Sequence, residues 1–301
     1  MTEPLALSPE VEEALRHERA VVALETTIVA HGFPRGEGLA VGLECERRVR
    51  EAGAVPATIA VLDGAVRVGL AETDLERVAA AGPEARKAGP RDLAACIVQR
   101  EIGATTVGGT LAACRIAGVR FMATGGIGGV HRGFAEVPDV SADVSELARA
   151  EVLVVCSGPK SLLDVRATVE LLETLGVPVM GFRTDEVPLF YAARGGPSVS
   201  QRVESPEEAA QIAAAHWQLG RRSALVLARA PDPALADVEP LIEQALAEAR
   251  RDGVAGQAVT PFVLEYLHEH SGGRTMEVNR QLVADNAALA GDVAVAYARP
   301  E

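Results

Sequence analysis

Short apolar runs alternate with amphipathic segments along almost the whole chain. The runs are rich in Val, Ala, Leu and Ile and are bounded by turn residues, which is typical of buried strands in a parallel sheet. The segments between them carry apolar residues at helical spacing. The alternation predicts an α/β fold, in which a large, mostly parallel or mixed sheet is flanked by helices in one layered domain over residues 1–301.

The pattern also predicts the order of the elements. Strands are expected at residues 20–24, 56–62, 65–68, 103–107, 119–123, 151–156, 177–182 and 224–228. Helices are expected at residues 9–18, 37–52, 73–76, 91–100, 108–117, 162–175, 204–219 and 237–251. Two more are expected between residues 260 and 298, with a break at the glycines of Ser271–Gly273.

Lys160 follows the predicted strand 151–156. Pro159 suits the first turn of a helix, which would place Lys160 in that turn, at the carboxyl end of a strand where open α/β sheets keep their active sites. The positive end of a helix dipole disfavours an ammonium group, so this amine should lose its proton easily and attack a carbonyl carbon. The alternative is a surface lysine at a helix start.

Glu25 ends another predicted strand, beside two threonines. A carboxyl group that stays partly desolvated at such a position has a raised pKa and makes a good general acid. The alternative is a solvated strand end. Lys87, in the basic segment 86–92, either neutralises a phosphate or is plain surface charge.

A glycine-rich segment covers residues 124–133. Backbone amides freed by glycine can hold a phosphate, and His131 and Arg132 add polar and charged groups. The segment lacks the spacing of a nucleotide-binding fingerprint, and a tight structural turn is the alternative.

Oxygen ligands cluster shortly after this segment. Asp139, Ser141 and Asp143 are suited to one hard divalent cation that keeps several waters, which favours magnesium or manganese. Alternatively, Asp143 and Glu146 form a helix-capping box. On the last predicted helix, Asn279 and Asn286 lie on one face and either offer amides to a polar ligand or face solvent.

The composition limits which partners and which cellular compartment are expected. The net charge is -13, and no block of Lys or Arg is dense enough to follow a phosphate backbone, so nucleic acid is not an expected partner. No apolar run is long enough for a membrane span, and the N-terminal residues do not resemble a signal peptide. The four cysteines form no C-x-x-C pair, which favours buried thiols in a cytoplasmic protein.

Several of these segments together resemble the pseudouridine-5'-phosphate glycosidase family, which includes indigoidine synthase A-like members. The matching stretches are Ala23–Thr27, Ala30–Gly32, Gly103–Val107, Thr124–Gly133, Asp139–Asp143, Gly158–Ser161, Leu171–Pro178 and Thr260–Phe262. The resemblance runs from about Val21 to Ala298. Asp285 departs from it, since the family usually has the first of two asparagines there, and so does the loop Arg229–Pro233.

The resemblance implies a reaction and its residues. The reaction is reversible cleavage of the C–C glycosidic bond of pseudouridine 5'-phosphate to uracil and ribose 5-phosphate. Lys160 would be the nucleophile that forms an imine, Glu25 the proton donor, and Asp139 the anchor of a manganese ion, with magnesium as the other possibility. The substrate-binding positions it implies are Lys87, Val107, Ser141, Ala142 and Asp143, and Asn286 corresponds to a family active-site asparagine. His131 and the glycines around it are our candidates for holding the phosphate. The resemblance also implies a homotrimer.

The expected chemistry suits a lysine and an acid. A C–C glycosidic bond has no basic leaving atom to protonate, so the usual pair of glycosidase carboxylates would serve poorly. An imine supplies the electron sink that such a bond needs in order to break. Two other functions use the same pocket: a class I aldolase-like lyase that cleaves a sugar phosphate, and a non-catalytic sugar-phosphate sensor.

Overall fold

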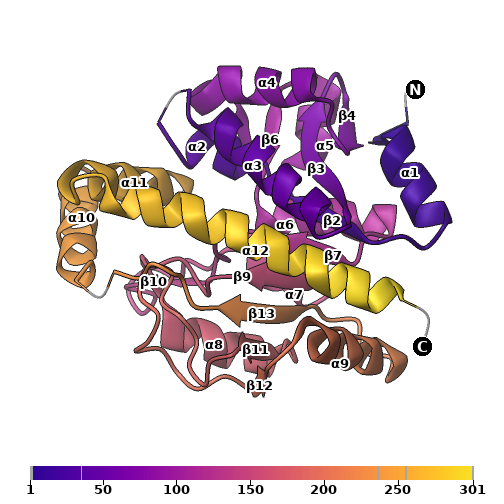
Figure 1. The fold of residues 1–301 in the computed structure, drawn as a ribbon. Coiled ribbons are helices and arrows are strands. Elements are labelled where there is room, and N and C mark those ends of the chain that lie inside the picture. The colour runs from indigo at the N-terminus through magenta and orange to yellow at the C-terminus, as the bar shows by residue number, and fades with distance from the viewer. Residues whose placement is uncertain (1–2, 35, 236, 255, 300–301) are drawn as a thin grey trace.

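The computed structural model describes residues 3–34, 36–235, 237–254 and 256–299. Its main strands are β1 (Leu5–Leu7), β2 (Val21–Leu24), β3 (Val55–Leu62), β4 (Ala65–Val68), β5 (Arg86–Ala88), β6 (Gly103–Thr105), β7 (Phe121–Ala123), β9 (Leu153–Cys156), β11 (Val179–Phe182), β12 (Gln201–Val203) and β13 (Leu225–Arg229). They form an eleven-stranded sheet in the order β1-β4-β3-β2-β7-β9-β13-β11-β12, with β6 pairing β3 and β5 pairing β6 (Figure 1). A separate pair joins β8 (Val130–His131) to β10 (Leu163–Asp164).

The centre of the sheet is parallel. β3, β2, β7, β9, β13, β11 and β12 run in one direction, whereas β4 and β6 are antiparallel to β3. The carboxyl ends of β2, β7 and β9 therefore meet side by side at one edge. The predicted α/β fold with a large, mostly parallel mixed sheet is confirmed.

Twelve α-helices of the described residues surround the sheet. They are α1 (Pro9–Arg16), α2 (Thr27–His31), α3 (Gly38–Glu51), α4 (Glu72–Ala81), α5 (Leu93–Gln99), α6 (Val107–Ala117), α7 (Ala142–Leu147), α8 (Val165–Thr174), α9 (Pro206–Gln218), α10 (Glu239–Arg251), α11 (Val259–His270) and α12 (Arg274–Ala298). α1 and α9 each begin with a serine cap followed by proline, and the serine hydroxyl accepts a backbone amide of the first turn. The predicted break between the last two helices is confirmed.

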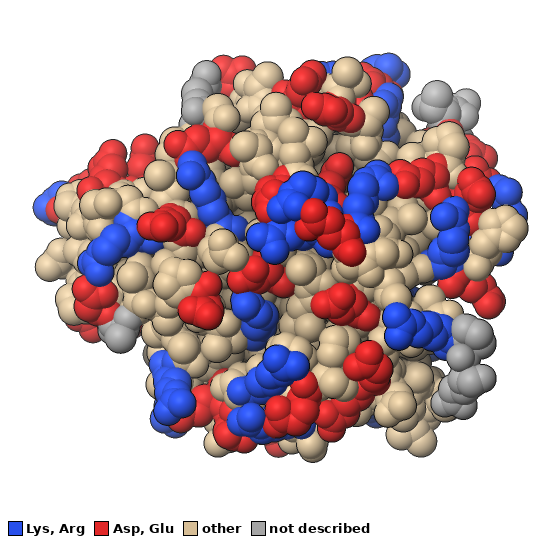
Figure 2. Space-filling model, in the orientation of Figure 1, with Lys and Arg blue, Asp and Glu red and all other residues tan. Residues whose placement is uncertain are grey.

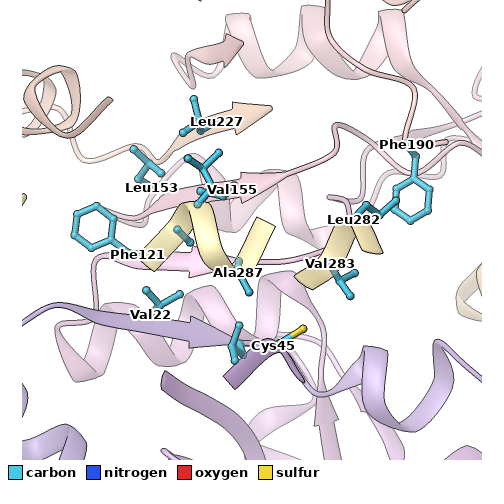
Figure 3. Close-up of a cluster of buried hydrophobic side chains, with 14 of the residues drawn as sticks. Val22, Cys45, Phe121, Leu153, Val155, Phe190, Leu227, Leu282, Val283 and Ala287 are labelled. Carbon is cyan, nitrogen blue, oxygen red and sulfur yellow. The ribbon is translucent and has the colours of Figure 1, made fainter. Parts of the chain in front are cut away.

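Strand side chains alternate between the two faces of the sheet. Val22 and Leu24 face one core cluster, whereas Val21 and Ala23 face the other. α12, yellow in Figure 1, crosses the first face over β2, β7 and β9. Figure 3 shows Leu282, Val283 and Ala287 of this helix among the strand side chains of that cluster.

Small residues let α12 lie close to its neighbours. A Cβ atom at Gly291 would lie only 2.6 Å from the Cβ atom of Ala52, which follows α3. On the opposite face of the sheet, α1, α6, α7 and α8 contribute the buried side chains of Val11, Leu111, Leu147 and Leu172. The sheet is thus covered on both faces, and its carboxyl edge is the part left for a site.

The surface and the cysteines agree with the composition. On the face in Figure 2, acidic and basic side chains are interspersed, and no broad basic patch is seen. All four cysteines are buried and free, as predicted. Among the described helices, none combines the length and apolar character that crossing a membrane requires.

Candidate active site

Glu25 lies at the carboxyl end of β2, in contact with the end of β7. It is only 6% exposed, and the hydroxyl of Thr124 donates a hydrogen bond to its Oε1. Burial raises the pKa of Glu25, although the nearby positive charge of Lys160 and the Thr124 hydrogen bond oppose the rise. The predicted desolvated carboxyl group at a strand end is confirmed.

Lys160 lies near Glu25 but not on a helix. The chain leaves β9 through a loop in which the Lys160 amide donates to the Ile127 carbonyl, and α8 begins only at Val165. The prediction of a helix opened by Pro159 is therefore wrong, and so is the helix-dipole argument for Lys160. The true start signal is Asp164, whose carboxylate accepts the Ala167 amide.

A glycine gives this loop its course. Gly158 has φ +83°, and a Cβ atom there would lie 2.2 Å from the Pro188 carbonyl oxygen. Ile127 and Pro159 form an isolated parallel bridge, which joins the loop to the glycine-rich segment. Lys160 is therefore held by tertiary contacts between two loops rather than by a helix.

Two lobes of a cavity meet at Glu25, Thr27, Lys87 and Lys160. The inner lobe, of about 50 Å³, is also lined by Ile28, His31, Gly32, Thr124, Gly125, Gly126, Phe190, Leu264 and Asn279. The outer lobe, of about 330 Å³, is also lined by Gly89, Pro90, Arg91, Asp92, Thr106, Gly128, His131, Asp139, Val140, Ser141, Ala142, Asp143, Leu163 and Gly256. A ligand that spans both lobes would pass the acid and both amines.

Lys87 lies on β5 and is largely buried. Burial, and after it the positive charge of Lys160, lower the pKa of its amine to about 8, while the charges of Asp143 and Glu25 oppose the shift. Lys87 is thus a titratable group of the cavity and not plain surface charge. Lys87 lines the cavity, so the prediction that it belongs to the site agrees with its position.

Asp143 acts as a structural clamp beside the outer lobe. Its two carboxylate oxygens accept the amides of Gly108 (2.7 Å) and Gly128 (2.8 Å). The cap of α7 is Ser141, whose hydroxyl accepts the Asp143 amide at 3.2 Å. The capping-box alternative for Asp143 is therefore wrong, and both of its carboxylate oxygens are already engaged by backbone amides.

Several amides of the glycine-rich segment, which was expected to hold phosphate, are already bonded within the protein. The Ile127 amide donates to the Gly158 carbonyl, the Gly128 amide to Asp143, and the Val130 amide to the Thr168 hydroxyl. A Cβ atom on Gly129 would lie 2.2 Å from the Thr168 hydroxyl oxygen. The glycines mainly permit close packing, so the predicted cradle is wrong for these amides.

His131 and Asp139 face each other across the outer lobe, with 3.9 Å between Nδ1 and the Asp139 carboxylate. Burial lowers the pKa of His131, and the Asp139 charge opposes that shift. In the described part of the chain, no three His, Cys, Asp or Glu side chains gather as a metal cage. The donor set fits only a cation that keeps most of its waters, such as magnesium or manganese.

Two predicted site residues have side chains away from the cavity. Val107 is fully buried in the core at the first turn of α6, and it lines neither lobe of the cavity. Asn286 is also fully buried, and its Nδ2 donates to the Thr124 carbonyl at 2.9 Å and to the Ser157 hydroxyl at 3.1 Å. It supports the residue that bonds Glu25.

Asn279 lines the inner lobe and lies two turns before Asn286 on the same face of α12. It is 4% exposed, and no hydrogen bond of its side chain appears among the described residues. The seven-residue spacing predicted that Asn279 and Asn286 share one face of the helix, but it does not tell which of them lines the cavity. Thr124 and Phe190 also line the inner lobe but were not predicted as site residues. Their local sequence does not distinguish a residue of the site from a residue of the core.

Asp285 forms an ion pair with Arg229 at the end of β13, with 3.1 Å between them. Position 285 and the loop 229–233 are two places where the sequence departs from the family. The departing residues Asp285 and Arg229 contact each other. The pair links α12 to the sheet beside Asn286.

A buried acid and two amines in one cavity at the carboxyl edge of an α/β sheet are typical of enzymes that act on sugar or carbonyl substrates. The chain belongs to the family described as Indigoidine synthase A like protein, whose model matches residues 10–296. It is 45% identical over 297 residues to pseudouridine-5'-phosphate glycosidase 2 of Photorhabdus laumondii, covering 97% of this chain and 95% of that one. The pseudouridine-5'-phosphate glycosidase of Escherichia coli K12 is 42% identical over 301 residues, or 99% and 96% of the two chains.

A solved structure is similar over nearly the same span. The prealnumycin C-glycosynthase AlnA, in complex with ribulose 5-phosphate, superposes with a TM-score of 0.89 at 35% identity and covers 99% of this chain and 98% of that one. The family expected from the sequence motifs is confirmed.

Proposed function

We propose that this enzyme reversibly cleaves the C–C glycosidic bond of pseudouridine 5'-phosphate to give uracil and ribose 5-phosphate. The observation that carries the proposal is the shared cavity in which the buried Glu25 carboxyl group lies beside the Lys160 amine. The curated relatives carry this activity in their names, and the structural neighbour holds a five-carbon sugar phosphate.

The two side chains divide the chemistry. Glu25 donates its proton to the ring oxygen as the C1'–O bond breaks, and the Lys160 amine bonds to C1'. The C1'–C5 bond then breaks, its electron pair and one amine proton pass to C5 of uracil, and C1' becomes an imine of Lys160. Water hydrolyses the protonated imine to the aldehyde of ribose 5-phosphate, which restores the amine and releases the one proton that Glu25 needs to regain.

The two lobes suit the two products. The inner lobe offers the apolar surfaces of Ile28, Phe190 and Leu264 and the amide of Asn279, which together fit a flat base with polar edges. The outer lobe offers Arg91 and, at the junction of the lobes, Lys87, which suit a phosphate. His131 and the wall formed by residues 141–143 complete that side.

Asp139 is the residue that would hold the manganese or magnesium ion, largely through waters. The ion would add positive charge near the phosphate side of the cavity. Manganese binding measured by paramagnetic resonance should weaken in an Asp139→Ala variant. Unchanged binding would remove Asp139 as the anchor.

We also propose a cytoplasmic homotrimer. The four buried, free thiols fit a reducing compartment, and the trimer rests on the family resemblance. Light scattering of the purified chain measures its mass directly, and a monomer or dimer would contradict the trimer.

Borohydride trapping tests the imine. With ribose 5-phosphate present, reduction should attach a five-carbon sugar phosphate to Lys160, and peptide mass mapping should find it there. The matched control is Lys87→Arg, which removes the other amine nucleophile of the cavity but should keep the adduct. An adduct on Lys87, or no adduct in a protein that still cleaves pseudouridine 5'-phosphate, would overturn the assignment.

An aldolase-like lyase that cleaves a sugar phosphate is the second candidate, because the structural neighbour binds ribulose 5-phosphate. The two functions differ in whether a base is consumed. If uracil and ribose 5-phosphate disappear together in equal amounts, the C-glycosidase is supported. Loss of the sugar phosphate alone would favour the lyase.

A further inference from the structure

A small cavity lies on the α3 side of Glu25 and shares Glu25, Ile28, Thr124 and Gly125 with the inner lobe. Its volume is about 20 Å³, enough for one water, and its walls include Glu25, Thr58, Leu24, Cys45 and Val283. Figure 3 shows Cys45 and Val283 in the core on the α12 face of the sheet. Glu25 therefore borders the ligand cavity on one side and this second cavity on the other.

Thr58 connects the small cavity to a second carboxyl group. It lies on β3, is 2% exposed, and its hydroxyl donates a hydrogen bond to Glu46 Oε1 on α3. Because the hydroxyl proton is directed at Glu46, the oxygen of Thr58 is left as an acceptor for a water in the cavity.

Glu46 is half-buried on α3. Burial raises the pKa of its carboxyl group, while the Thr58 hydrogen bond and the Arg50 charge oppose the shift and the charges of Glu10 and Glu72 support it. Arg50 is itself paired with Glu10. Glu46 can therefore hold a proton more readily than an exposed glutamate and exchange it with solvent.

We propose that Thr58 and Glu46 form a proton relay that serves Glu25 through one water in the small cavity. The inference rests on the proposed function, in which Glu25 gives up and regains a proton in each turnover. Glu25 is almost sealed from solvent, and its open side is the cavity that a substrate fills. A route behind it lets the proton exchange while the ligand is bound.

The transfer conserves protons at each step. The Glu25 hydroxyl proton passes to the water, a proton of that water passes to the Thr58 oxygen, and the Thr58 hydroxyl proton passes to the Glu46 carboxylate. The net result moves one proton from Glu25 to Glu46 and leaves the water and Thr58 neutral. The reverse sequence reloads Glu25.

Thr58→Val and Thr58→Ser form a matched pair. Valine keeps the shape of threonine without the hydroxyl, so kcat should fall about tenfold, KM should stay unchanged and the solvent deuterium isotope effect on kcat should increase. Serine keeps the hydroxyl and should retain wild-type kcat and isotope effect. Wild-type kcat in Thr58→Val, or an equal loss in Thr58→Ser, would overturn the relay.

A measurement without substrate separates this relay from the proposed function. The infrared carboxyl band of protonated Glu25, identified by its absence in Glu25→Gln, should shift and exchange deuterium more slowly in Thr58→Val and in Glu46→Gln than in Thr58→Ser. If the wild type fails to cleave pseudouridine 5'-phosphate, the proposed function fails, but the band still decides the relay. A band that does not respond to either variant refutes it.

Discussion

At the scale of single residues, burial pushes the acid and one amine of the cavity toward their neutral forms. It raises the pKa of Glu25 and lowers that of Lys87 to about 8. A carboxyl group that keeps its proton can act as the acid in ring opening, and an amine that titrates near pH 8 makes phosphate capture depend on pH. The two shifts predict separate effects of pH.

Lys87→Arg should abolish the decline of kcat/KM above about pH 8. In the wild type, Lys87 loses its charge as the pH rises through about 8, so phosphate capture should weaken and kcat/KM should fall above that pH. Arginine stays charged throughout, so the variant should lack the limb near pH 8. The check is a pH profile of kcat/KM from pH 6 to 10; any decline left in the variant reports Glu25, and an unchanged limb would exclude Lys87.

Glu25→Gln should lower the catalytic activity and raise the stability of the protein at high pH. Loss of the proton donor should lower kcat by about a hundredfold or more. The pKa of Glu25 is raised in the folded state, so the wild type loses stability as the pH rises through that pKa, and glutamine escapes the loss. The variant should match the wild type near pH 4, where glutamate is still largely protonated in the unfolded chain, and unfold at a higher temperature at pH 8.

Thermal scans at both pH values check this expectation. Glu84→Gln, at an exposed position, is the matched control and should shift the unfolding temperature equally at the two pH values. A Glu25→Gln variant that is less stable than the wild type at pH 8 would contradict the account of its burial.

At the scale of elements, Asp143 ties α6 and the glycine-rich segment to α7. Its two charged hydrogen bonds to Gly108 and Gly128 should each contribute roughly 1.5–3 kcal/mol. Asp143→Asn leaves one amide facing an NH₂ group, so the free energy of unfolding should fall by about 2 kcal/mol and KM should rise as the outer lobe shifts. Denaturant titration measures the first effect and steady-state kinetics the second.

Asp164→Asn is the control for that substitution. Asp164 caps α8 at an exposed position, where asparagine caps equally well, so stability should change by only a few tenths of a kcal/mol. A similar loss in both variants would show that Asp143 is not a special clamp.

The same elements show how far sequence reasoning reaches. Strand ends are visible as the point where an apolar run meets a polar residue, so Glu25 and the neighbourhood of Lys160 were predicted correctly. The local course after β9 was not, because Gly158 and the bridge between Ile127 and Pro159 are tertiary features with no local pattern. A helical reading was the natural error, since Pro159 also suits a first turn.

Asn279 and Asn286 mark another limit. α12 is buried along most of its length and residues seven apart lie on one face, so its periodicity does not tell which of the two asparagines lines the cavity. The family motif likewise could not tell that Asn286 bonds Thr124 rather than lining the cavity. Because the two asparagines share one face, which amide meets a ligand depends on where along the helix the cavity lies.

At the scale of the whole molecule, the cavity joins segments that lie far apart in the chain. Its lining runs from Glu25 at the end of β2 to Asn279 on α12, with Lys87 and Lys160 between them. A ligand bound there connects the first and last parts of the chain to the centre of the sheet. Binding should therefore stabilise the entire fold and not one loop.

Ribose 5-phosphate should raise the unfolding temperature of the wild type. At a hundredfold excess over its dissociation constant, it should add about 2.7 kcal/mol to the free energy of unfolding, which corresponds to roughly 5 °C for a chain of this size. Lys160→Arg keeps the charge but cannot form an imine, so its shift should be clearly smaller at the same concentration. Equal shifts in the two proteins would mean that the sugar phosphate binds without bonding to Lys160, and that the imine does not hold the ligand in the resting enzyme.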